Sequence, residues 1–134
     1  MTARRMLIVA SLLWVAGCGR DAVAPPDAVV GQYGGRAVLL LATGETVRVQ
    51  VECGGAAVFN RPIIPASDGQ FWLAPTLSTS NGVTAAVAIK GTVDSDQIAF
   101  DITRLGPYGD VTTAQFLVKR DEPAEWIGMA CAAG

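Results

Sequence analysis

Histidine is absent from this chain of 134 residues. Its absence excludes Ser-His and Cys-His catalysis and zinc sites built on His ligands. Charge is also scarce, because charged residues make up only 16% of the chain and the formal net charge is −2. Since nucleic-acid-binding proteins carry a basic surface, no nucleic-acid partner is expected. Hydrophobic residues make up 51%, which excludes disorder along the whole length.

No apolar run reaches the about 20 residues that a membrane-spanning helix needs. The longest run, Met6–Ala16, follows Arg4 and Arg5. A short apolar run behind positive residues is typical of a secretory signal peptide. The arginine pair leaves twin-arginine export open beside the general route, and a short buried helix is the structural alternative.

The run ends in Val15-Ala16-Gly17-Cys18, which resembles the bacterial lipobox, where small residues precede a cysteine. The resemblance implies a lipoprotein signal peptide over residues 1–17, cleaved between Gly17 and Cys18. It also implies acyl chains of the palmitate kind on Cys18, which would anchor the chain to the cell envelope without spanning the membrane. By analogy with enteric bacteria, Gly19 favours the outer membrane, facing the periplasm.

Residues 18–30 are predicted to form the lipidated cysteine and a flexible tether. Pro25 and Pro26 favour extended, solvated backbone, which would reach about 35–40 Å over this length. Cleavage would remove two of the 10 basic residues, leaving 8 against 12 acidic ones and a formal charge of −4. Such a chain offers no polybasic patch for anionic lipid, so the acyl chains must supply the membrane contact.

From Gly31 onward the hydrophobic pattern has a period of two. In Thr46–Cys53, for example, Val47, Val49, Val51 and Cys53 share one face, as in a half-buried strand. Further strands are predicted at Arg36–Ala42, Val83–Lys90, Gln97–Thr103 and Thr112–Lys119.

Turn residues separate the predicted strands at intervals of about 8–14 residues. Examples are Ser80-Asn81-Gly82 and Asp94-Ser95-Asp96. No long amphipathic helix is expected, although Asp121–Trp126 could hold one helical turn. Residues 31–134 therefore predict an all-β domain, a small antiparallel up-and-down β-barrel of about 7–8 strands, with a β-sandwich as the alternative.

The chain has three cysteines. With Cys18 assigned to lipid, Cys53 and Cys131 remain in a compartment where disulfides form. A bond between them would contribute about 4–5 kcal/mol by the chain-entropy estimate. Free buried thiols are the alternative, and a redox or metal pair would need a closer spacing or further ligands.

The chain contains the start Tyr33-Gly34-Gly35, the strand end Cys53-Gly54-Gly55, the stretch Gly91–Ile98 and a cysteine near the C-terminus, Cys131. With these motifs, roughly residues 33–131 resemble a family of small uncharacterised bacterial exported proteins and lipoproteins. These motifs are structural, and the family implies no particular activity.

No set of residues marks a catalytic centre. Asp94 and Asp96 flank a turn, where calcium would need further oxygen ligands. The cluster Asp121, Glu122 and Glu125 could take calcium or a basic partner, with a solvated loop as the alternative. Ser-Lys chemistry would require Lys90 or Lys119, both on outward strand positions. We therefore expect no metal, no cofactor and no enzymatic activity; a hydrolase would have to use acids such as Asp94, Asp96 and Asp101.

Three aromatic residues are candidates for surface contact: Trp72, Tyr108 and Trp126. The favoured hypothesis is a monomeric, non-catalytic binding or structural module that contacts an envelope protein or glycan. An alternative is a lipocalin-like carrier of a small apolar ligand; a third is an inhibitor of an envelope-targeting hydrolase. Carrier and filled barrel differ in core volume, and the inward mixture of Ala85 and Ala114 with Phe100 and Phe116 does not decide between them.

Overall fold

The computed structural model describes residues 27–80 and 82–128. They form eight strands: β1 (Gly31–Gly35), β2 (Val38–Ala42), β3 (Val47–Val51), β4 (Gly55–Phe59), β5 (Gln70–Ser80), β6 (Val83–Asp94), β7 (Gln97–Leu105) and β8 (Val111–Arg120). All neighbouring strands pair antiparallel, in the order β4-β3-β2-β1-β8-β7-β6-β5. The predicted all-β meander is confirmed. The predicted helical turn at Asp121–Trp126 is wrong, because this segment runs without helix along the β1–β2 turn.

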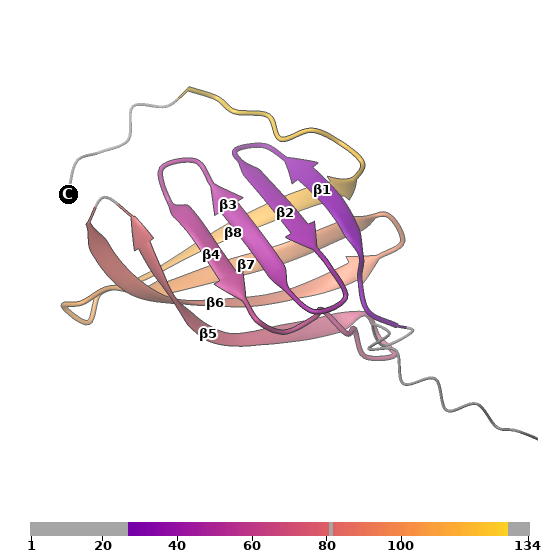
Figure 1. Cartoon of the computed structure of the whole chain (residues 1–134), viewed down its shortest axis with the longest axis horizontal. Coiled ribbons are helices and arrows are strands. Elements are labelled where there is room, and N and C mark those ends of the chain that lie inside the picture. The colour runs from indigo at the N-terminus through magenta and orange to yellow at the C-terminus, as the bar shows by residue number, and fades with distance from the viewer. Residues whose placement is uncertain (1–26, 81, 129–134) are drawn as a thin grey trace, which may run out of the picture.

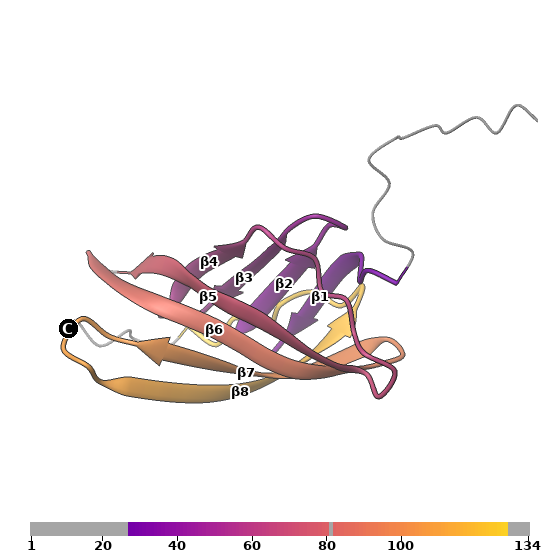
Figure 2. The ribbon, with the colours of Figure 1, turned by 90° about the horizontal axis from the view of Figure 1, so that it is seen from below.

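The sheet curls into a nearly closed barrel because its first and last strands, β1 and β8, pair with each other. In Figure 1, β1–β4 lie in front of β5–β8, and Figure 2 shows the two groups as facing layers that meet at β1 and β8. The structure is therefore the predicted small antiparallel barrel.

The remaining seam runs between β4 and β5, which lie side by side without a backbone ladder. Two side chains of β5 bridge it. Thr76 Oγ1 donates to the Val58 carbonyl at 3.1 Å, and Ser78 Oγ donates to the Ala56 carbonyl at 2.8 Å. A bulge between Leu73 and Thr76 precedes them; it contains Pro75, which has no N–H to offer a ladder.

The inward faces agree with the predicted alternation. Val47 and Val49 are buried in β3, Ile98 and Phe100 in β7. Cys53 does not lie in a strand, contrary to the prediction. Because β3 ends at Val51, Cys53 lies in the β3–β4 turn with φ 64°. Every buried side chain in the described range lies between Val29 and Val118, so the segment from Gly19 to Gly134 contains the whole described core.

One end of the barrel is filled around Tyr33, which is completely buried. The Arg120 guanidinium donates to the Tyr33 hydroxyl at 2.7 Å and lies 5.3 Å from its ring centroid. Val29, just before β1, is also buried in the core, and its N–H donates to the Ile63 carbonyl at 2.9 Å.

Residues 121–128, here called the C-terminal strap, run from β8 past the β1–β2 turn to the β3–β4 turn (Figure 1). Glu125 exchanges backbone hydrogen bonds with Gly35 and Ala37. The strap crosses so close to Gly34 that a Cβ there would overlap the backbone of Glu122 and Pro123. Glycine at this position is therefore a packing requirement of the strap.

Candidate functional site: a cavity inside the barrel

A cavity of about 220 Å³ lies inside the barrel, toward the β7–β8 turn. Along β7 and β8 the interior changes from close-packed side chains, Ile98 and Val118, to cavity-lining ones. The lining is mostly apolar and comes from both layers of the barrel, including Val49, Val87, Ile89, Ile102, Ala114 and Phe116.

The cavity arises from unequal strand lengths and from small side chains. Strands β1–β4 have 5 residues each, whereas β5–β8 have 9 to 12. The long strands therefore continue past the short ones and leave one end uncovered. On β8, Thr112 and Ala114 line the cavity and are still exposed to solvent, so the cavity is open to water at this end.

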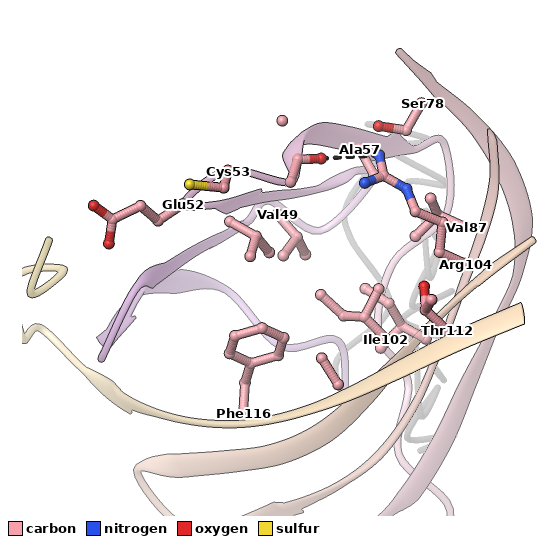
Figure 3. A pocket seen from close by; sticks show the side chains of 15 residues that line it. Val49, Glu52, Cys53, Ala57, Ser78, Val87, Ile102, Arg104, Thr112 and Phe116 are labelled. Carbon is pink, nitrogen blue, oxygen red and sulfur yellow. Dashed lines mark hydrogen bonds between the residues drawn. The ribbon is translucent and has the colours of Figure 1, made fainter. Parts of the chain in front are cut away.

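Polar groups are few and gather near the opening. The Arg104 Nη2 donates to the Gly54 carbonyl at 2.9 Å, which ties β7 to the β3–β4 turn across the barrel. Its cross-strand partner, Thr112, also lines the cavity. On the β5 side of the cavity, the Ser78 hydroxyl already donates to the Ala56 carbonyl across the β4–β5 seam. Figure 3 shows Arg104 extending over the apolar side chains toward the β3–β4 turn.

Glu52 lies at the same rim but is directed away from the Arg104 guanidinium (Figure 3). Its carboxylate oxygens accept the N–H groups of Ile127 and Gly128 at 2.9 and 2.7 Å. In the described part of the chain, the ion pair that forms is between Arg120 and Asp96, and no carboxylate pairs with Arg104. Arg104 is therefore the cationic group beside the cavity opening.

Arg104 is not among the site residues predicted from the sequence. The available signal was the alternation of β7, in which Ile98, Phe100 and Ile102 point inward and Arg104 follows in the same phase. The predicted strand ends at Thr103 and so leaves this arginine outside it, whereas β7 continues to Leu105. A charged residue on the inward phase of a strand near its end is the pattern that would have identified it.

The predicted cysteine and lipid sites are only partly described. Gly17, Cys18 and Cys131 lie outside the described residues. Cys53 is disulfide-bonded and lies at the rim of the cavity. Its pairing with Cys131 stays a prediction.

The three aromatic candidates lie on separate elements and form no common site. Trp72 is 62% exposed on the outer face of β5, Tyr108 is 96% exposed in the β7–β8 turn, and Trp126 belongs to the strap. Trp72 does have polar neighbours. Successive cross-strand pairs place it in a row with Lys90, Asp101 and Gln115.

The acidic candidates do not converge on the cavity. Asp94 and Asp96 flank the β6–β7 turn, where Asp96 faces Arg120 at 3.6 Å. Asp121, Glu122 and Glu125 are distributed along the strap. Over residues 27–80 and 82–128, no group of three or more His, Cys, Asp or Glu side chains could hold a metal ion.

Comparison with known proteins adds no family. No protein-family model, no curated protein and no solved structure matches this chain. The resemblance noted in the sequence therefore stays a prediction. Among the described residues, no helix is long and apolar enough to cross a membrane.

Proposed function

We propose that this protein is a lipid-anchored, non-catalytic binding protein of the bacterial envelope that carries a small apolar ligand inside its barrel. The cavity is the observation that carries the proposal. Its volume of about 220 Å³ exceeds the roughly 150 Å³ that admits benzene in an engineered apolar site. It is smaller than the about 300–1,000 Å³ of drug-sized pockets, so the expected ligand is a short hydrocarbon chain or a single small ring system.

The composition of the lining supports binding rather than catalysis. Of the two lining hydroxyls, Ser78 is already bonded to the Ala56 carbonyl, and Thr112 lies opposite Arg104, which is a cation and not a base. The lining carboxylate, Glu52, holds the strap. Cys53 is disulfide-bonded. The lining thus offers no nucleophile beside a base, which covalent hydrolysis would need. The lipobox-like Val15-Ala16-Gly17-Cys18 supports attachment to the envelope through acyl chains.

Octanol, a small neutral probe, tests the proposal. The chain from Gly19 to Gly134 is exported into an oxidising compartment, delipidated and titrated with octanol by calorimetry. Saturable binding is expected, and Ala114→Phe should abolish it by filling the cavity. Thr113→Phe is the matched control because Thr113 is the exposed neighbour of Ala114 on β8. Absence of saturable binding in the unmodified domain would reject the carrier function.

Binding of an envelope glycan is a second candidate, favoured by the exposed Trp72 and the polar row beside it. An indole offers a flat apolar face, and Lys90, Asp101 and Gln115 could form hydrogen bonds with hydroxyl groups. Sedimentation with purified cell-wall glycan tests this candidate. Trp72→Ala should reduce co-sedimentation, whereas Leu77→Ala, another exposed apolar residue of β5, should not. Equal co-sedimentation of the two variants would reject it.

A further inference from the structure

Arg104 combines partial burial with a guanidinium that is only partly used. A guanidinium has five N–H donors, and the Arg104 hydrogen bond in the described structure goes from Nη2 to the Gly54 carbonyl at 2.9 Å. That acceptor is a neutral carbonyl, and no described carboxylate pairs with Arg104. Removing a cation from water without an opposite charge costs free energy. An anion bound beside Arg104 would offset this cost.

The position of Arg104 separates a polar rim from an apolar interior. Along the inward face of β7, Ile102 lines the cavity and Arg104 follows toward the opening. Thr112, directly across on β8, adds a hydroxyl at the same level. A ligand with one polar end and one apolar end would therefore bind with its polar end at the rim and its hydrocarbon against Ile102 and Phe116.

We infer that Arg104 is the head-group subsite of the cavity, which takes a small amphiphile with a single carboxylate, of about the size of octanoate. The inference rests on the proposed carrier function. A carboxylate fits because the planar guanidinium can donate two parallel hydrogen bonds to its oxygens. The hydrocarbon of such a ligand matches a cavity of about 220 Å³ that is lined mainly by apolar side chains.

Matched probes test the assignment on the chain from Gly19 to Gly134. Octanoate and octanol share the same hydrocarbon and differ in the charge of the head group. By calorimetry at neutral pH, octanoate should bind at least about 10-fold more tightly than octanol, the range expected for charge-assisted hydrogen bonds. Arg104→Gln should remove this preference, so that octanoate binds no more tightly than octanol, because glutamine keeps hydrogen-bonding groups and loses the charge.

Two further variants complete the test. Arg48→Gln is the matched control, since Arg48 is exposed on the outer face of β3 and should keep the octanoate preference. Arg104→Lys should retain part of the preference, because it keeps the charge and loses the two-point hydrogen bonding.

The outcomes separate the two proposals. If neither probe binds the unmodified domain, the carrier function fails and this inference fails with it. If octanol and octanoate bind equally, or if Arg104→Gln keeps the preference, the cavity stands as a binding site and the role of Arg104 is overturned. If Arg104→Gln weakens both probes by the same factor, Arg104 has only a structural role at the rim, which also overturns the inference.

Discussion

At the scale of single residues, the clearest feature is how the buried hydroxyl of Tyr33 is accommodated. A phenol with no exposed surface would lose its hydrogen bonds with water, and Arg120 replaces them from the end of β8. The same guanidinium lies against the Tyr33 ring. Asp96, in contrast, is 85% exposed at its side chain and meets Arg120 at 3.6 Å, where solvent screens the pair.

Replacing Arg120 by methionine should therefore lower the free energy of unfolding by about 1–3 kcal/mol, because the Tyr33 hydroxyl is left buried without its donor. Urea denaturation followed by tryptophan fluorescence measures the loss. Asp96→Asn is the control and should have little effect, since it removes only the exposed ion pair. Equal losses in the two variants would show that the ion pair, and not the phenol, dominates.

At the scale of elements, the seam between β4 and β5 shows how two side chains can substitute for a backbone ladder. Ser78 is buried, and its hydroxyl donates across the seam to Ala56. Thr76 bonds Val58 in the same antiparallel register, two residues away on each strand. Closure of the barrel here depends on β5 side chains rather than on N–H groups.

Ser78→Ala should destabilise the domain by about 1 kcal/mol, the usual net value of one intramolecular hydrogen bond. Thr79→Ala is the comparison, because Thr79 is the exposed neighbour that bonds Thr84 away from the seam. Denaturant midpoints of the two variants measure the two losses of stability. A larger loss in Thr79→Ala would contradict the importance of the seam.

The strap is bonded to β1 and the β1–β2 turn through its backbone, and its far end is bonded to the side chain of Glu52. Glu52 accepts two backbone N–H groups of the strap, and charged acceptors form the stronger hydrogen bonds. Glu52→Ala should therefore raise the hydrogen-exchange rates of Ile127 and Gly128 by about 10-fold. The control is Glu45→Ala, an exposed glutamate of the β2–β3 turn. Unchanged exchange in Glu52→Ala would mean that other contacts hold the strap.

At the scale of the whole molecule, the strap brings the C-terminal region to the turn that contains Cys53. Gly128 is bonded to Glu52, the neighbour of Cys53. Cys131 is three positions after Gly128 in the sequence, and a chain of that length can span at most about 10 Å. This geometry supports the predicted Cys53–Cys131 pairing.

Cys131→Ser should then cost about 2–5 kcal/mol of stability, as loss of a disulfide does in small secreted domains. Thermal unfolding in non-reducing buffer measures the loss, and thiol labelling of the variant should detect Cys53. The double variant with Cys53→Ser should be no less stable than the single one. If both thiols of the unmodified domain are labelled before reduction, the pairing is wrong.

Much of the fold follows from local patterns. Alternation in Gln97–Thr103 and Thr112–Lys119 predicted which side chains point inward, because successive residues of a strand face opposite sides. The turns were predictable from Gly, Asn and Asp. Two local predictions failed. Cys53 lies in a turn with positive φ and not in its predicted strand. Asp121–Trp126 forms no helical turn, because its N–H and C=O groups pair with β1 and the β1–β2 turn rather than with each other.

The sequence by itself determined the strand periodicity, the turn positions and the absence of histidine chemistry, since each depends on a residue and its near neighbours. Only the tertiary structure decided that β1 pairs with β8, that β5–β8 extend past β1–β4, and that the space between them is a cavity with Arg104 at its rim. The physical reason is that a cavity forms where the side chains of distant strands are too small to fill the space between them. Alternation assigns Ala114 and Phe116 to the same face, but only barrel closure determines what lies opposite them.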